Sequence, residues 1–176
     1  MKFNGVYMIR KVDISESLLT GKATENVILL NSNMSMPNVL AFAPDHSKIY
    51  VSNSDPRDKY WKVSDVSPNT GALSNGRIFF DANELYEIEK EKGIIKENNG
   101  YPDGLKVDIN GNIFASGSGG VLVFSPSEKL IGRFRLDKPV SNVAFGGDGW
   151  LYFTNSDKIV RICIKAKPIK TISSHF

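Results

Sequence analysis

The chain has 176 residues, which corresponds to one domain at roughly 100 to 200 residues per domain. Its 41% hydrophobic and 23% charged residues are typical of a globular protein and exclude disorder, collagen and a coiled coil. The 22 basic and 19 acidic residues leave a net charge of +3 and are spread along the chain, so no basic stripe indicates a nucleic-acid partner.

The sequence indicates neither a membrane segment nor a disulfide. No apolar run approaches the roughly 20 residues of a spanning helix, and residues 1–11 lack the apolar stretch of a secretory signal. We therefore expect a soluble chain with no membrane partner and no visible signal peptide, in an unassigned compartment. The single cysteine, Cys163, excludes an internal disulfide, and its apolar neighbours predict a buried strand residue.

Short apolar or alternating runs, bounded by turn-forming residues, predict an all-β chain. Their spacing of about 8 to 12 residues favours a sandwich, a barrel or a propeller. Residues 105–109 and 112–116 flank Asn110-Gly111, which predicts a hairpin with a two-residue type I′ turn. The predicted strands are 5–10, 26–30, 39–43, 48–52, 77–80, 105–109, 112–116, 121–124, 130–136, 142–145, 151–154 and 159–164.

Residues 82–92 form the one predicted helix. Leu85 and Ile88 share a side, charged residues occupy the rest, and Gly93 follows as a C-terminal cap. We expect this short helical insertion to cover a face of the sheet, with Glu87 and Glu91 on a solvated surface.

Three segments repeat one pattern, in which a polar residue precedes an apolar strand, a turn and a second strand. The polar residues are Asn38, Asp103 and Asn142, which stand 65 and 39 positions apart. Without the roughly 25-residue helical insertion both intervals are about 40, the size of a four-stranded propeller blade. The chain then holds little more than three blades, whereas propellers typically have 4 to 8, so it reads as part of a ring.

Six short words in this order resemble the gluconolactonase and senescence-marker-protein (regucalcin-like) family over residues 3–164. They are residues 3–7 (FNGVY), 37–45 (PNVLAFAPD), 50–56 (YVSNSDP), 102–104 (PDG), 119–126 (GGVLVFSP) and 142–147 (NVAFGG). The resemblance implies a six-bladed propeller with a divalent cation at the top of its channel, which hydrolyses sugar lactones to aldonic acids. We expect residues 1–164 to form a partial propeller, and the composition of residues 165–176 predicts a basic C-terminal tail.

The resemblance also implies a metal and catalytic site. Asn38 and Asp103 correspond to two cation ligands, and Asp103 also to the general base. The third ligand, a glutamate, would lie upstream of Met1. Oxygen ligands favour Ca²⁺, with Mg²⁺ or Zn²⁺ as alternatives. Val39 stands where the family usually has glycine.

Other interpretations of the same residues stay open. Asn and Asp before a strand often cap turns through their own backbone, and this interpretation is favoured for Asn142. Asn53, Asp55 and Asn142 are weaker candidates for substrate binding.

Three functions compete. The first is a lactone hydrolase, either truncated or completed by another chain. The second is a catalytically incompetent propeller remnant that acts as a binding or interaction module. The third is a sugar-binding module without turnover. Exposed blade edges predict self-association.

Overall fold

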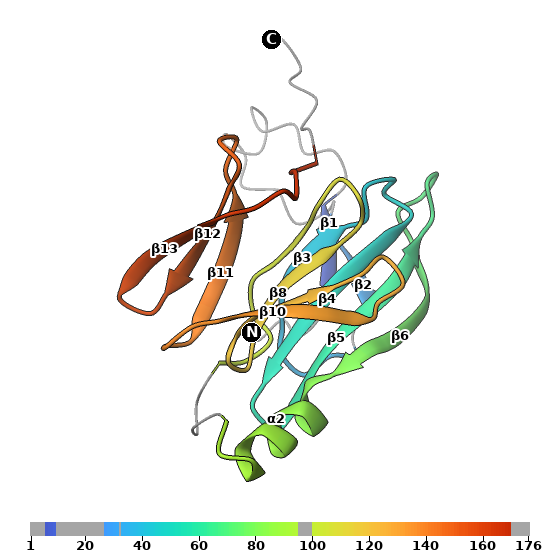
Figure 1. Ribbon diagram of the computed structural model, residues 1–176. Helices are drawn as coiled ribbons and strands as arrows, with labels where there is room; N and C mark the ends of the chain where they lie inside the picture. Colours follow the sequence, from blue (N-terminus) through green and yellow to red (C-terminus); the bar gives the residue numbers. More distant parts are fainter. Residues whose placement is uncertain (1–5, 10–26, 32, 95–99, 170–176) are drawn as a thin grey trace, which may run out of the picture.

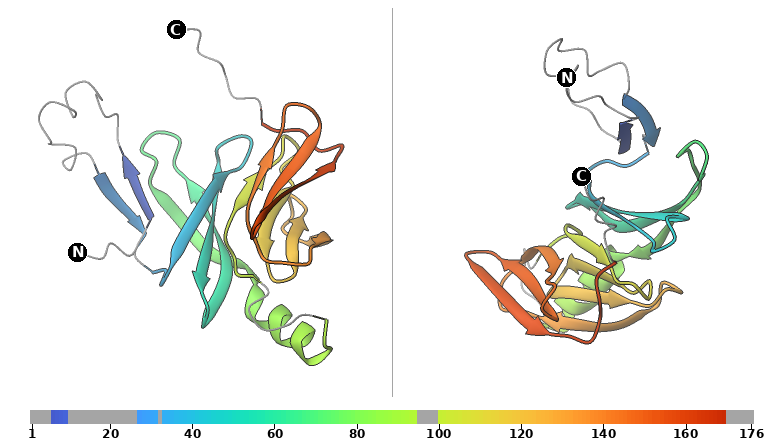
Figure 2. Two further views of the ribbon diagram at one scale, coloured as in Figure 1. Left: turned by 90° about the vertical axis from the view of Figure 1, so that its left-hand side faces the viewer. Right: turned by 90° about the horizontal axis from the view of Figure 1, so that it is seen from above.

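The computed structural model describes residues 6–9, 27–31, 33–94 and 100–169, and within them it is mainly β-strand with a single helix. The strands form four antiparallel sheets that lie side by side in chain order (Figures 1 and 2). The predicted all-β class with one short helix is therefore correct. Most of residues 1–11, where the sequence shows no secretory signal, and residues 170–176 of the predicted tail lie outside the described residues.

Each sheet is built from strands that are neighbours in sequence. The first sheet pairs β1 (Val6–Ile9) with β2 (Val27–Asn31). The second contains β3 (Pro37–Phe42), β4 (Lys48–Asp55), β5 (Asp58–Val66) and β6 (Leu73–Asp81). The third contains β7 (Leu105–Val107), β8 (Ile113–Gly117), β9 (Gly120–Phe124) and β10 (Leu130–Arg135). The fourth contains β11 (Val140–Phe145), β12 (Trp150–Asn155) and β13 (Lys158–Cys163).

The hydrophobic core lies between these sheets. Trp61 of β5 and Phe124 of β9 are fully buried, with ring centroids 5.8 Å apart, and they join the second sheet to the third. Phe114 of β8 contacts Phe145 of β11 edge to face at 5.2 Å and joins the third sheet to the fourth. Such aromatic contacts stabilise the packing by about 0.5 to 1.5 kcal/mol each beyond area burial.

The first strands of the three larger sheets lie next to one another. β7 contacts both β3 and β11, and the backbone N–H of Gly104 donates to the carbonyl of Ser141 at 2.8 Å. Polar residues near the starts of these three strands therefore gather at one end, and the last residues of the same strands gather at the other end. This arrangement positions both pockets described below.

Helix α2 (Ala82–Glu91) agrees with the predicted helix. The Asp81 carboxylate caps it by accepting from the Asn83 backbone N–H at 2.8 Å, and Gly93 adopts φ +65° just beyond its end. The prediction placed Ile88 on the buried side of the helix and the charged residues on the solvent side. In the structure Ile88 is 40% exposed, whereas Glu89 is only 5% exposed. In the described part of the chain, no helix is long and apolar enough to cross a membrane.

Three local predictions need correction. The β7–β8 hairpin forms, but Asn110 lacks the positive φ of a type I′ turn, because the buried Asp108 carboxylate accepts from the backbone N–H groups of Asn110 and Asn112 and holds a longer loop. Cys163 lies in a strand but is exposed, because β13 is an edge strand. Strand β5 was absent from the predicted series.

Residues 165–169 contact the third sheet. The Ile109 backbone N–H donates to the carbonyl of Lys167 at 2.9 Å, and Asp108 forms a bridge with Pro168. Ile169 packs against the core between the second and third sheets.

Candidate functional site

The structure brings Asn38 and Asp103 together from two different sheets. The Asn38 Nδ2 donates to Asp103 Oδ1 at 2.7 Å and to Ser54 Oγ at 3.1 Å. Asn38 lies where the register of β3 against β4 shifts, between the pairs Pro37–Asn53 and Leu40–Val51. Such an irregularity commonly redirects a side chain next to a functional site. Val39 fits this backbone without a positive φ, and its N–H donates to Ser52 Oγ at 3.0 Å.

Asp103 is held at the start of β7 by its neighbours in the Pro-Asp-Gly word. The Asp103 backbone N–H donates to the carbonyl of Ser116 at 3.3 Å, and the Pro102 carbonyl accepts from the Ser54 hydroxyl. Gly104 has no room for a side chain, because a Cβ there would lie 2.4 Å from Asn142 Cα. Glycine after the aspartate therefore permits the close approach of β11 that closes the site.

These residues line a pocket of about 260 Å³, which we call the entry pocket. Asn38, Ser54 and Asp103 form one side, and Tyr101, Pro139 and Ser141 contribute others. Partial burial raises the pKa of Asp103, and the hydrogen bond from Asn38 offsets part of that rise. The pocket thus contains a carboxylate that is a stronger base than an exposed aspartate.

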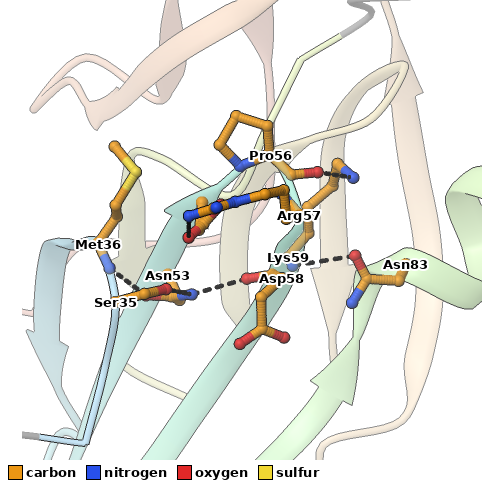
Figure 3. A network of polar contacts seen from close by, with 9 residues as sticks. Ser35, Met36, Asn53, Pro56, Arg57, Asp58, Lys59 and Asn83 are labelled. Atoms are coloured by element: carbon orange, nitrogen blue, oxygen red, sulfur yellow. Dashed lines mark hydrogen bonds and ion pairs between the residues drawn. The ribbon is translucent and has the colours of Figure 1, made fainter.

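Asn53 and Asp55 belong to the β4–β5 hairpin. Figure 3 shows Asn53 among Ser35, Met36 and Asp58. The fully buried Asn53 accepts from the Met36 N–H at 2.8 Å and donates to the Asp58 carbonyl at 2.7 Å and to Ser35 Oγ at 3.1 Å. Asp55 accepts from the Arg57 side chain at 3.1 and 3.2 Å, which lowers its pKa to about 2. Neither residue lines the entry pocket.

Asn142 lies beside the site without lining the pocket. It is exposed on β11, and its Oδ1 accepts from the Val143 backbone N–H at 2.9 Å. Its neighbour Ser141 does line the pocket. These contacts match the turn interpretation of Asn142 more closely than the substrate-binding one.

Ser54 and Tyr101 line the entry pocket but were missing from the sequence-based candidates. Lys59 lies behind this lining, with Nζ 4.7 Å from the ring centroid of Tyr86 and 5.9 Å from that of Tyr101. Ser54 could have been found, because it sits one residue after Asn53 in the repeat word. The Lys59 contacts depend on α2 folding back over β5 and carry no sequence signal.

Asp103 offers carboxylate oxygens and Asn38 carries an amide oxygen, and oxygen ligands suit hard cations such as Ca²⁺. Its Asn38 amide now presents nitrogen to Asp103, and a half-turn about the terminal bond would present Oδ1 instead. Among the described residues, no group of three or more His, Cys, Asp or Glu side chains could hold a metal ion. Asn38 and Asp103 therefore fit part of a calcium coordination sphere, which needs 6 to 8 oxygens.

Comparison with known proteins places this geometry in context. Residues 4–157 match the family described as SMP-30/Gluconolactonase/LRE-like region. The gluconolactonase of Zymomonas mobilis is 33% identical over 140 residues, which cover 78% of this chain and 37% of that protein. A pentonolactonase of Haloferax volcanii is 29% identical over 124 residues, which cover 69% of this chain and 38% of that protein. The chain thus spans less than two fifths of the length of either relative.

Solved structures of a gluconolactonase and of a regucalcin are also similar to this chain. A gluconolactonase of Xanthomonas campestris superposes with a TM-score of 0.60 at 26% identity, covering 77% of this chain and 39% of that one. Regucalcin of Agrobacterium tumefaciens, a calcium-binding protein, superposes with a TM-score of 0.62 at 20% identity, covering 81% of this chain and 50% of that one. The second comparison concerns the fold alone.

Proposed function

Because the chain belongs to the SMP-30/gluconolactonase/LRE-like family, we propose that it carries the catalytic pair of a metal-dependent sugar-lactone hydrolase. The carrying observation is the 2.7 Å contact between Asn38 and Asp103, which come from separate sheets and line one pocket. The expected substrate is a small sugar lactone and the product an aldonic acid.

For the architecture, we propose that residues 1–164 form about three blades of a six-bladed propeller, followed by a tail at 165–176. Two four-stranded antiparallel meanders support this proposal, as does the adjacency of their first strands with β11. A chain that spans 37% of its Zymomonas relative would be a fragment of the enzyme or would need another chain to complete the ring.

For the cofactor, we propose a divalent cation, Ca²⁺ before Mg²⁺ or Zn²⁺, held by Asp103 and by Asn38 Oδ1. Ser54 Oγ and water would supply further oxygens. When bound, such a cation supplies a Lewis acid that polarises the lactone carbonyl.

The chain's own residues account for the proton transfer. Asp103 accepts a proton from water as the water oxygen attacks the lactone carbonyl carbon. The bond from that carbon to the ring oxygen then breaks, and protonated Asp103 gives its proton to the ring oxygen, which becomes a hydroxyl while the Asp103 carboxylate is restored. Asn38 orients the Asp103 carboxylate, and Ser54 holds Asn38 and the Pro102 carbonyl in place. Tyr101 and Pro139 form part of the pocket wall.

The direct test measures hydrolysis of glucono-δ-lactone by the 176-residue chain with added Ca²⁺. We expect Asp103→Asn to lower kcat by about 10² to 10⁴-fold, the usual contribution of a general base, and a chelator to abolish turnover. Asp137→Asn, an exposed aspartate outside the pocket, is the matched control. Turnover that survives both Asp103→Asn and the chelator would contradict the proposal.

The alternative is a binding module without turnover. The presence of a single carboxylate at the pair, Asp103, favours it, because no three acidic, His or Cys side chains of the described chain come together. Calcium binding that depends on Asp103, with no lactone hydrolysis at any calcium concentration, would establish this alternative.

A further inference from the structure

A second pocket lies at the opposite ends of the strands that carry the entry pocket. It has a volume of about 330 Å³, and we call it the end pocket. Phe42 closes β3, Lys106 and Val107 lie at the end of β7, and Phe145 closes β11. Pro168 and Ile169 line it from the segment that crosses the third sheet. Its volume is that of a small-molecule site.

Among the described residues, Lys106 is the one charged residue that lines the end pocket. Its ammonium group has three N–H donors. Within the described chain it donates to the carbonyl of Leu105 at 3.1 Å. No carboxylate of the described residues forms an ion pair with it. Burial lowers its pKa, with no charged neighbour contributing to the shift.

An ammonium group half-buried among apolar side chains without a counter-charge is unfavourable, because it has lost water without gaining an anion. The apolar lining of the end pocket also determines which kind of molecule can carry the anionic group. Phe42, Phe145 and Ile169 offer no hydrogen bonds, so hydroxyl groups placed there would lose their water without replacement. An aromatic or short aliphatic body would instead gain from burial.

We propose that the end pocket binds a small apolar monocarboxylate, whose carboxylate pairs with Lys106 and whose body packs between Phe42 and Phe145. The site is separate from the entry pocket and independent of lactone hydrolysis. Its ligand class also differs from a sugar acid, which carries hydroxyl groups along its length.

The test titrates benzoate into the full 176-residue chain and follows binding by calorimetry and by backbone amide shifts in NMR spectra. We expect saturable binding that shifts residues of the end pocket and leaves Asp103 and Tyr101 unchanged. Lys106→Met, which keeps most of the aliphatic stem, should weaken benzoate binding at least about tenfold, the cost of one charge-assisted hydrogen bond. Lys106→Arg keeps the charge and should retain binding, which separates loss of charge from loss of fold.

Two controls make the result specific. Lys62→Met removes another half-buried lysine, in β5 and outside the pocket, and should leave benzoate affinity unchanged. Benzamide, the neutral counterpart, should bind wild type at least about tenfold more weakly than benzoate, and Lys106→Met should remove that difference. Failure of benzoate to saturate, equal affinity of wild type and Lys106→Met, or tighter binding of gluconate than of benzoate would each overturn the proposal. Activity against glucono-δ-lactone plays no part in these outcomes.

Discussion

At the scale of single residues, the carboxylate of Asp103, which serves the proposed function, lowers the stability of the folded chain. Burial raises the pKa of its carboxyl above the unfolded value, so ionised Asp103 destabilises the folded chain at pH values above its folded pKa. We predict that Asp103→Asn raises the free energy of unfolding at neutral pH in the presence of a chelator, although it removes the proposed base. Urea denaturation at pH 7 and at lower pH values measures this.

The sign of the pH dependence follows from the same shift. The gap between the variant and wild type should be largest above the folded pKa of Asp103 and should shrink as the pH falls through it, because wild type then holds a neutral carboxyl. Asp137→Asn, at an exposed position, should show no such convergence. A variant less stable than wild type at pH 7 would mean that the contact with Asn38 outweighs the cost of burial.

A second residue-scale feature is a buried asparagine at the end of the second strand of two sheets. Asn53 holds Met36 and Ser35 ahead of β3, and Asn155 holds Lys138 and Pro139 ahead of β11, with Nδ2 2.6 Å from the Lys138 carbonyl. Each therefore fixes the segment that enters an inner strand, and Pro139 belongs to the wall of the entry pocket.

We predict that Asn53→Ala lowers the free energy of unfolding by about 3 kcal/mol, because it leaves the Met36 N–H and the Asp58 carbonyl without this partner. Chemical denaturation measures the loss. Asn33→Ala, at an exposed position, serves as the control and should change stability by less than about 0.5 kcal/mol. Equal effects of the two substitutions would refute the role of Asn53 in holding the segment before β3.

At the scale of elements, α2 is fastened to the third sheet by an ion pair. Glu89 lies on the buried side of the helix, and its carboxylate accepts from Arg133 Nη1 at 2.5 and 2.7 Å and from Arg135 at 3.3 Å. The side chains of Glu89 and Arg133 are 7% and 10% exposed, so their charges are poorly screened by solvent.

We predict that Glu89→Ala destabilises the chain by about 3 kcal/mol, because it leaves the Arg133 guanidinium buried without its anion. Replacing both partners, Glu89→Leu with Arg133→Leu, should recover most of that loss, since no unpaired charge remains. Denaturation and hydrogen exchange across α2 check both outcomes, with the exposed Glu87→Ala as control. A double variant as unstable as the single one would show that the pair does more than neutralise charge.

At the scale of the whole molecule, the part of the fourth sheet that the structure describes has three strands, one fewer than the second and third sheets. Its edge strand β13 exposes Ile159 at 78% and Ile162 at 38%, beside Lys158 and Arg161. An edge strand with exposed apolar side chains is a template for pairing with another chain. The predicted self-association would use this edge.

We predict that the chain associates in a concentration-dependent manner in light scattering and that Ile159→Lys weakens the association, because a charge at the edge disfavours strand pairing. Ile78→Lys, on the outer strand β6, tests whether any exposed isoleucine has the same effect. A wild-type chain that remains monomeric across the concentration range would exclude this role for β13.

The sequence by itself determined the features that depend on local patterns. Alternating apolar runs and turn residues indicated most strands, the spacing of Leu85 and Ile88 indicated α2, and the repeated words pointed to Asn38 and Asp103. It missed β5, whose alternation is obscured because Tyr60 and Ser64 on one face of the strand are buried as well as Trp61 and Val63 on the other. Burial on both faces of a strand removes the alternation that a sequence pattern needs.

Only the tertiary structure decided which residues meet. The ion pair of Glu89 with Arg133 and the contact of Lys59 with Tyr101 join elements that are far apart in the chain. The end pocket around Lys106 likewise brings together the ends of three separate strands. The same holds for the buried hydrogen bonds of Asn53, which a sequence pattern cannot tell from a substrate contact. The reason is physical: burial and charge pairing are set by packing between sheets, and the residue types alone do not state which sheets pack together.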